Sequence, residues 1–302
     1  MSAVVPRTGS MSLEPAGEIS LQWTQAWRGL LMLRATGVTA SHPHHVHDYF
    51  SVGVVDRGEG EIQCRGESYR AGPGSVILIS PYEPHTEACL SRDGWSLRFI
   101  HPAPATMRRL LGLEGTGILD QLRFVRPVVE DNALADRLDR MFRRSAQATD
   151  GSIDEVTAEG VRSALKRQLR VTGSNGRVLR SHRAAELARV RIRDSRRKMI
   201  SLTELSTLTG LSRFHLSRAF RDATGLPPYA YYEQVRIARA KVLMRLGHEL
   251  SAVAMALGFS DQSHLHRQFK AVSATTPGRY ARALRSVFCP RQQKAQSFNR
   301  EV

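Results

Sequence analysis

Hydrophobic positions along the chain follow two different periods. Between residue 19 and about residue 102, short apolar or alternating runs are separated by turn-forming residues, as where Glu61-Ile62-Gln63-Cys64 meets Arg65-Gly66-Glu67. Many short runs at near-regular spacing are typical of a sandwich or a small barrel. The pattern predicts strands near residues 30–33, 49–55, 61–64, 75–79 and 95–100.

From residue 104 to residue 172 the spacing becomes helical. Leu134, Leu138, Met141 and Phe142 recur at i, i+4, i+7 and i+8, and a second apolar stripe runs between residues 153 and 169. Each stripe predicts an amphipathic helix. The apolar faces can pack within this chain or form a homodimer interface through residues 130–170, and the period alone does not separate these alternatives.

A polar stretch from Thr172 to Arg177 precedes a region in which every apolar run has helical spacing. This composition is typical of a linker. We therefore expect a multidomain α+β protein. Its parts would be a flexible tail at 1–18, a barrel at 19–103, a helical packing or dimerisation segment at 104–172, a linker at 173–182, an all-α domain at 183–285 and a second flexible tail at 286–302.

The all-α region contains an internal repeat. Residues 210–221 and 258–270 share glycine, histidine, leucine, arginine and phenylalanine at offsets of 48 or 49 positions. Each copy predicts a short helix, a glycine turn, a serine N-cap (Ser212 or Ser260) and a second helix with a polar, basic face. This is the pattern of a helix-turn-helix unit, whose second helix enters the major groove of DNA.

The exposed positions of the two second helices are the candidate DNA contacts. Arginine suits guanine, glutamine suits adenine, and lysine or arginine suits phosphate. The first copy offers Arg213, Phe214, Ser217, Arg218 and Arg221, and the second offers Asp261, Gln262, Ser263, His266, Arg267 and Lys270.

A long helix is expected between the copies, at about residues 229–246. Val235, Ala238, Val242 and Leu246 would form its apolar stripe, and a second face would be basic, with Arg236, Arg239, Lys241 and Arg245. Such a spacer would hold the two units at a fixed separation. Two units on one face of a duplex lie about one helical turn apart, roughly 34 Å.

The charge of the chain points to the same partner. Lysine and arginine number 44 against 28 aspartate and glutamate, a net charge of +16, and residues 181–302 hold 22 basic and 8 acidic residues, a net of +14. A concentrated positive field favours a polyanion, and we expect double-stranded DNA. We expect no membrane span or leader and a cytoplasmic location, since no apolar run reaches about 18 residues and the three cysteines are widely spaced.

Residues 183–285 resemble the DNA-binding domain of AraC/XylS-type transcription regulators. The resemblance lies in residues 254–270, Ala-Met-Ala-Leu-Gly-Phe-Ser-Asp-Gln-Ser-His-Leu-His-Arg-Gln-Phe-Lys, followed by Thr276-Pro277-Gly278-Arg279-Tyr280. His266 and residues 271–274 depart from the usual pattern. The resemblance implies base-facing positions for Phe214 and Arg218, and for Gln262, Ser263 and Arg267. It also implies an activator that works with RNA polymerase on the bacterial nucleoid, with a small effector bound in the barrel.

Histidines gather in the amino-terminal half. His42, His44, His45 and His47 precede one predicted strand, and His85 follows another. His45-x-His47 and residues 74–85 resemble the two motifs of cupin barrels, which implies a cupin-like fold. His45, His47 and His85 are the candidate metal ligands. The acidic position of the first motif holds Ser51 or Val52, so we expect neither a metal nor another cofactor.

The interior of a small barrel is wide enough for one small ligand. We expect His45, His47, Tyr49, His85 and Trp95 to line such an effector pocket, although ordinary core positions use the same residue types. The leading hypothesis is a sequence-specific transcription regulator without enzymatic activity, controlled by a small molecule. The alternative is a metal-dependent cupin enzyme tethered to DNA.

Overall fold

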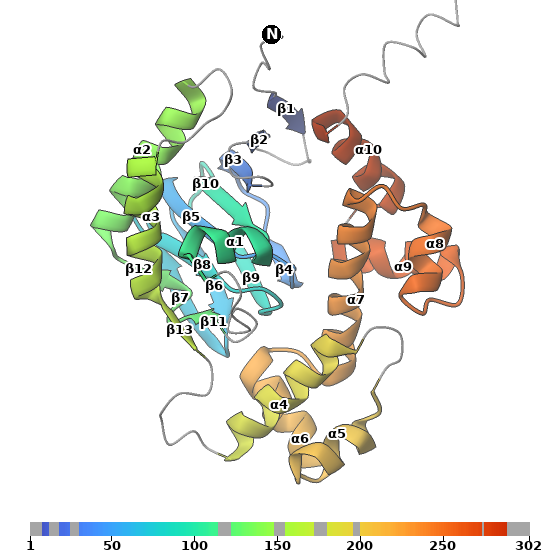
Figure 1. Ribbon diagram of the computed structural model, residues 1–302. Coiled ribbons are helices and arrows are strands. Elements are labelled where there is room, and N and C mark those ends of the chain that lie inside the picture. The colour runs from blue at the N-terminus through green and yellow to red at the C-terminus, as the bar shows by residue number, and fades with distance from the viewer. Residues whose placement is uncertain are drawn as a thin grey trace, which may run out of the picture.

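The computed structural model describes residues 8–11, 18–24, 30–113, 122–147, 155–171, 180–195, 200–273 and 275–288. Figure 1 shows a β-rich half with helices along its outer side and a helical half beside it. The long helix α7 (Pro228–Arg245) runs along the helical half, with small helices gathered at each of its ends. No described helix is both long and apolar enough to cross a membrane.

The strands lie where the short apolar runs predict them, with additional strands between. They are β1 (Thr8–Met11), β2 (Glu18–Thr24), β3 (Leu30–Val38), β4 (His42–His45), β5 (Ser51–Arg57), β6 (Gly60–Cys64), β7 (Glu67–Ala71), β8 (Val76–Ile79), β9 (His85–Cys89), β10 (Trp95–Pro102), β11 (Leu122–Phe124), β12 (Val128–Val129) and β13 (Leu169–Val171).

The helices divide between the two halves. The first half contains α1 (Pro104–Leu111), α2 (Asn132–Gln147) and α3 (Glu155–Gln168). Besides α7, the second half contains α4 (Arg180–Asp194), α5 (Leu202–Thr209), α6 (Arg213–Thr224), α8 (Leu250–Ala256), α9 (Gln262–Ser273) and α10 (Pro277–Phe288).

Two antiparallel sheets form the body of the first half. The larger has the strand order β1-β2-β3-β10-β5-β8-β12, and the smaller has the order β4-β9-β6-β7. Strands β11 and β13 form a separate pair. Residues of both sheets share one buried cluster, in which Ile62 and Ala71 of the smaller sheet accompany Ile77, Leu97 and Phe99 of the larger. The two sheets therefore enclose one apolar interior.

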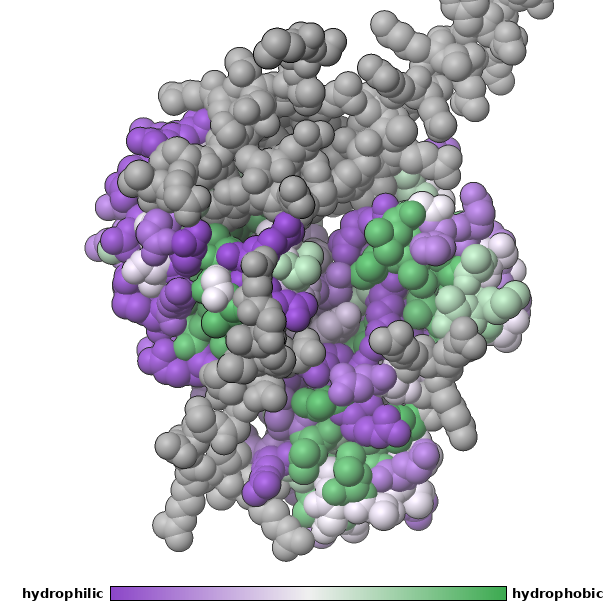
Figure 2. Space-filling view, viewed as in Figure 1, coloured by the Kyte–Doolittle hydropathy of each residue, from purple (hydrophilic) through white to green (hydrophobic). Residues whose placement is uncertain are grey.

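The other face of the larger sheet is covered by helices. Val52, Val54 and Leu78 belong to a second buried cluster together with Leu138 of α2 and Leu165 of α3. Strands β5 and β8 are therefore buried on both sides, which explains their nearly continuous apolar sequences. The predicted stripe of α2, and the described part of the second stripe from Val161 to Leu169, thus pack in the core of this chain. Figure 2 shows a mostly hydrophilic outer surface over these helices.

Three expectations for the segments outside the barrel were wrong in part. Residues 104–172 are not only helical, because β11, β12 and β13 lie among the helices. The expected tail at 1–18 contains β1, which pairs with β2 along residues 19–22. The helix α4 begins at Arg180 and α10 ends at Phe288, so helix extends into the expected linker and the second tail. Residues 172–179, which include most of the predicted linker, lie outside the described residues.

The helical half contains two buried clusters, one for each repeat. Leu205 of α5 and Leu216 and Phe220 of α6 pack in the first, while Leu265 and Phe269 of α9 pack in the second. Helix α7 contributes to both clusters. Its residues Tyr231, Tyr232, Val235 and Ala238 lie in the first, and Ile237, Ala240 and Met244 lie in the second.

The predicted basic face of α7 is not a solvent-exposed surface. Arg236 is only 5% exposed; it pairs with Glu233 at 2.7 Å and lies 3.6 Å from the centroid of the Phe259 ring. Arg239 donates to the carbonyls of Arg193 and Ser195. These arginines hold α7 against its neighbours, so their charge contributes to packing within the chain.

Gly53 in β5 allows an aromatic ring to lie against the strand. A Cβ atom added at Gly53 would lie 2.3 Å from the Phe99 ring. We predict that Gly53→Ala lowers the free energy of unfolding by about 1–3 kcal/mol, because the buried ring must shift. Urea unfolding of the full chain measures this. The matched control is Gly278→Ala, where an added Cβ meets nothing within 4 Å. Equal stability of the two variants would contradict the prediction.

Candidate functional site

Helix α6 follows α5 after a glycine turn and begins at a serine cap, as in a helix-turn-helix unit. The αL conformation of Gly210, with φ of 67°, ends α5, and the Ser212 side chain accepts a hydrogen bond from the His215 backbone N–H at the start of α6. Leu216 and Phe220 are buried, so the helix has one fixed inner face. Arg213, Phe214, Arg218 and Arg221 are exposed, and Ser217 is half-buried.

Helix α9 repeats this arrangement with one correction. The predicted cap Ser260 is wrong, because Asp261 Oδ1 accepts from the His264 backbone N–H at 2.7 Å. The hydrogen bonds from His264 and from the Ser260 hydroxyl lower the pKa of the Asp261 carboxyl. Asp261 is therefore engaged in starting the helix. The other candidate DNA contacts of α9 are all exposed: Gln262, Ser263, His266, Arg267 and Lys270.

The second helices of the two repeats, α6 and α9, lie toward opposite ends of α7 (Figure 1). Helix α7 has 18 residues, which corresponds to a length of roughly 27 Å at 1.5 Å per residue. This is of the order of the helical repeat of DNA, roughly 34 Å. The geometry supports the spacer that the sequence predicts.

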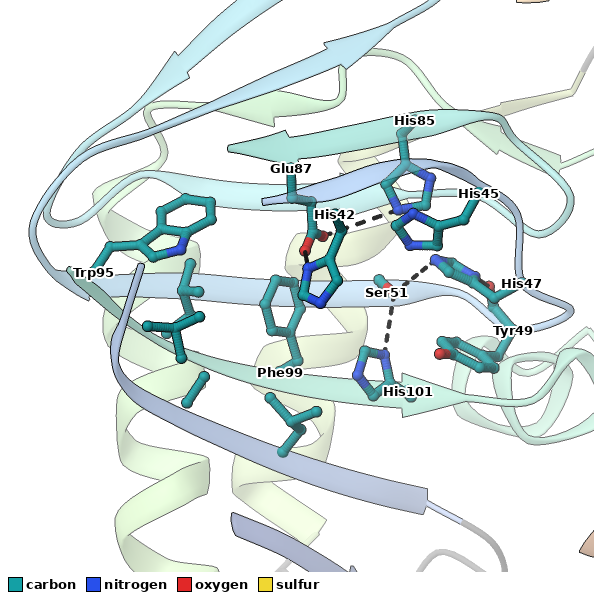
Figure 3. A pocket seen from close by; sticks show the side chains of 14 residues that line it. His42, His45, His47, Tyr49, Ser51, His85, Glu87, Trp95, Phe99 and His101 are labelled. Atoms are coloured by element: carbon teal, nitrogen blue, oxygen red, sulfur yellow. Dashed lines mark hydrogen bonds and ion pairs between the residues drawn. The ribbon is translucent and has the colours of Figure 1, made fainter. Parts of the chain in front are cut away.

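A cavity of about 180 Å³ opens between the two sheets of the barrel. One part of its wall is apolar and the other is rich in imidazoles (Figure 3). All five residues predicted to line a pocket are present. Among the described residues, the lining consists of Leu33, Ala35, Val38, His42, His45, His47, Tyr49, Ser51, His85, Glu87, Trp95, Leu97, Phe99 and His101.

Backbone carbonyls orient three of the imidazoles. The Nδ1 atoms of His45, His47 and His85 donate to the carbonyls of Pro43, Tyr49 and Glu83, at 3.0, 2.8 and 2.9 Å. In the neutral rings of His45 and His47 these contacts leave Nε2 as an acceptor, whereas His85 Nε2 faces Glu87 Oε1 at 3.9 Å. The hydroxyl of Ser51 lies 3.2 Å from His47 Nε2 and 3.1 Å from His101 Nδ1, and Figure 3 shows this bridge. It can donate to the first ring and accept from the second.

Burial keeps most of these imidazoles uncharged. Desolvation lowers the pKa of His101 to about 4 and that of His45 to about 3, and holds the pKa of His47 well below its usual value. His42 differs, because its hydrogen bond with Glu87 raises its pKa. Burial alone would raise the pKa of the Glu87 carboxyl, but the hydrogen bond with His42 and the neighbouring imidazoles lower it. The cavity thus combines neutral imidazoles with the carboxylate of Glu87, which lies 3.5 Å from His42 Nδ1 and 3.9 Å from His85 Nε2.

The three metal candidates are neighbours in space. The ring centroids of His45 and His47 lie 4.2 and 5.0 Å from that of His85. Among the described residues, however, no group of three histidine, cysteine or acidic side chains is placed to hold a metal ion. Ser51 is one of the two candidates for the acidic position of the cupin motif, and its hydroxyl lies within hydrogen-bonding distance of His47. The donor set as placed suits hydrogen bonding to an organic ligand better than a metal.

Sequence reasoning missed four polar members of this wall: His42, Ser51, Glu87 and His101. Glu87 and His101 lie on β9 and β10, at sites with no motif of their own. The alternation of β9 offers a signal, since Glu87 follows His85 by two residues and therefore faces the same side.

Two family models match the chain. Residues 29–165 match the AraC-like ligand binding domain, and residues 205–283 match a helix-turn-helix domain. The chain belongs to the AraC-type transcription regulators. It combines the DNA-binding and ligand-binding domains of that family, as the resemblance implies.

Relatives extend over most of the chain. A Bacillus subtilis protein, "Uncharacterized HTH-type transcriptional regulator YbfI", is 28% identical over 247 residues, 77% of this chain and 84% of the relative. The transcriptional activator RhaS of Klebsiella pneumoniae is 26% identical, over 76% of this chain and 84% of the relative. Both are named as transcription regulators rather than as enzymes.

Among solved structures, ToxT from Vibrio cholerae shares the fold. One ToxT structure covers 84% of this chain and 97% of its own, with a TM-score of 0.51 and 14% identity. Another, with a TM-score of 0.52 and 12% identity, covers 90% of this chain and 97% of its own and has an unsaturated fatty acid bound. At this identity the likeness concerns the two-domain architecture alone.

The depressed pKa values of His45, His47 and His101 predict a pH-dependent stability. The unfolded chain takes up protons on these histidines below pH of about 6.5, whereas the folded chain does not. Stability should therefore fall as the pH is lowered from about 6.5 toward 4, with His42 opposing part of the fall. Urea unfolding between pH 7.5 and 5 measures this dependence.

The variant His101→Asn should lose part of that pH dependence, since it removes one buried neutral imidazole. The exposed His248 supplies the control variant His248→Asn, which should retain it. Identical pH profiles for the two variants would show that His101 does not contribute.

Proposed function

We propose that α6 and α9 read successive major-groove segments of one DNA duplex, and that a small molecule in the barrel cavity controls this binding. The observation that carries the proposal is the placement of two exposed polar helix faces toward the two ends of one helix, α7. The net charge of +14 on residues 181–302 supports the choice of DNA.

The exposed side chains divide by chemistry. Arg218 and Arg267 suit guanine, Gln262 suits adenine, and Phe214, whose side chain remains 74% exposed, can contact a thymine methyl group. Arg213, Arg221 and Lys270 suit phosphates, and His266 and the smaller Ser217 and Ser263 complete the two faces. Asp261 acts first as the cap of α9.

The effector would be a small molecule with polar groups at one end and apolar surface at the other. Imidazoles, Ser51 and Glu87 line one part of the cavity, and Leu33, Val38, Leu97 and Phe99 line another. Its volume of about 180 Å³ limits the ligand to a small metabolite or to one part of a larger molecule. The fatty acid bound to ToxT supports a small organic effector as the general class.

The direction of regulation is inferred from the names of the relatives. RhaS is named an activator, and we extend activation, with RNA polymerase as partner on the bacterial nucleoid, to this chain. We propose the domain boundaries of the sequence analysis with one change, an all-α domain that extends from Arg180 to Phe288. Homodimerisation through residues 130–170 would have to use the outer faces of α2 and α3, because their apolar stripes are buried in the core. Sedimentation of the full chain tests it, and a monomer at high concentration would reject it.

The base-reading assignment predicts the effect of two substitutions. A duplex selected from a random-sequence library by the wild-type protein serves as the operator. Arg218→Ala and Arg267→Ala should each weaken its binding by roughly 1–3 kcal/mol and relax the preference at one base position. Fluorescence anisotropy at several salt concentrations measures the affinity and its salt dependence.

The matched control is Arg57→Ala, which removes an exposed arginine from β5 of the barrel. Its operator affinity should equal that of the wild type. If both reading-helix variants also bind like the wild type, with unchanged base preference, the assignment of α6 and α9 is refuted.

The effector assignment predicts selective stabilisation. Metabolites that bind the cavity should raise the melting temperature of the full chain, because a ligand that binds only the folded state stabilises it by mass action. Ala35→Leu adds a larger side chain to the cavity wall, so it should abolish the shift for the same metabolites. Undiminished shifts in this variant would place the binding site elsewhere.

A further inference from the structure

One short segment of the barrel, His44–Tyr49, contacts both the cavity and the DNA-binding half. We propose that this segment transmits occupancy of the cavity to the DNA-binding half through side chains that alternate between the two. The inference rests on the proposed effector control and names its physical path.

The odd-numbered residues face the cavity. His45, His47 and Tyr49 all line it, and Ser51 continues the series into β5. The rings of His47 and Tyr49 are stacked, with centroids 4.2 Å apart and an interplanar angle of 2°. A ligand in the cavity therefore meets a connected row of side chains in this segment (Figure 3).

The first two even-numbered residues engage the first helix-turn-helix unit. The His44 carbonyl accepts a hydrogen bond from Gln234 Nε2 of α7 at 2.9 Å. Its ring lies so near Gly225, at the end of α6, that an added Cβ there would lie 2.6 Å from His44 Nε2. Val46 is only 3% exposed and belongs to the same buried cluster as Leu216 and Phe220. A barrel residue thus completes the core of this unit.

The third even-numbered residue reaches the far end of α7. Both carboxylate oxygens of Asp48 lie near Arg245 Nη2, at 3.0 and 2.9 Å. The same guanidinium group lies 5.8 Å from the ring centroid of Tyr49, a cavity residue. The segment is therefore attached along α7 from Gln234 to Arg245.

A second loop reinforces the connection. The Tyr82 N–H donates to the His47 carbonyl at 2.7 Å, and the Tyr82 carbonyl accepts from Tyr231 Oη at 2.8 Å. Tyr82 adopts a φ of 56°, a conformation that costs a non-glycine residue free energy and requires support from its surroundings. Through Tyr82, these bonds link α7 to the backbone of a cavity residue.

The side chains of the segment His44–Tyr49 are packed on both sides. A ligand that moves the odd-numbered residues therefore also displaces their even-numbered neighbours. Coupling of this kind requires the ligand to favour one arrangement of the contacts over another, and the effect is reciprocal. DNA binding that changes the contacts between this segment and α7 must therefore also change the arrangement of the cavity residues.

A double-mutant cycle in the full chain tests the path without an identified effector. Ala35→Leu serves as the occupant, since Ala35 lines the cavity from β3. Asp48→Asn combined with Gln234→Leu removes two of the even-side contacts. Operator affinity, measured with the selected duplex, should change about fivefold or more on Ala35→Leu in the wild-type background. It should change less than twofold in the uncoupled background.

The control for the uncoupling change is Asp93→Asn, the same chemical substitution at an exposed turn of the barrel. There the effect of Ala35→Leu should persist. An equal effect in the uncoupled background would overturn the path while leaving effector control intact. No effect in any background would overturn both effector control and the path.

Hydrogen exchange provides a readout that does not depend on the folding of Ala35→Leu. Adding the selected duplex should change amide exchange in residues 42–51 of the wild-type chain, and this change should be lost on Asp48→Asn with Gln234→Leu. Exchange that is unchanged by DNA in the wild-type chain, or changed equally in the variant, would overturn the path.

Discussion

The burial of α7 in two separate cores is the constraint on which the DNA-reading half depends. Tyr231 and Val235 fix the helix to one unit, and Ile237 and Met244 fix it to the other. Since these residues lie on one continuous helix, the hydrophobic effect that stabilises each unit also sets the separation between them. Neither α6 nor α9 can shift along α7 without exposing apolar surface.

The fold of the reading half could be predicted closely because its signals are local. Gly210 and Ser212 lie where a helix must end and the next begin, and the structure confirms both. Ser260 and Asp261 show the limit of this reasoning. Both residue types are strong caps, and only the geometry shows that the carboxylate meets the His264 amide.

The barrel was less predictable because its determinants are distant in sequence. The apolar runs predicted β5 and β8, but β4 and β9 consist largely of polar residues and acquire their place through pairing with each other. The histidine motifs located one part of the cavity wall. The alternation of β9 offers a signal for Glu87, whereas His101 joins that wall through strand register, which composition and spacing do not encode. The packing role of Arg236 and Arg239 in α7 could not be predicted either. A basic stripe has the same sequence pattern whether it faces DNA or a buried carboxylate.

The position of Val46 changes what counts as a domain in this protein. Its side chain belongs to the core of a unit that begins more than a hundred residues later in the sequence. A carboxyl-terminal fragment that begins near residue 180 would lack the Val46 side chain. It would leave an apolar gap in the buried cluster that contains Phe220. A chimera that joins this carboxyl-terminal half to a foreign barrel would need an apolar residue of similar shape at the position of Val46. Compatibility between the two halves therefore depends on steric fit as well as on the peptide that joins them.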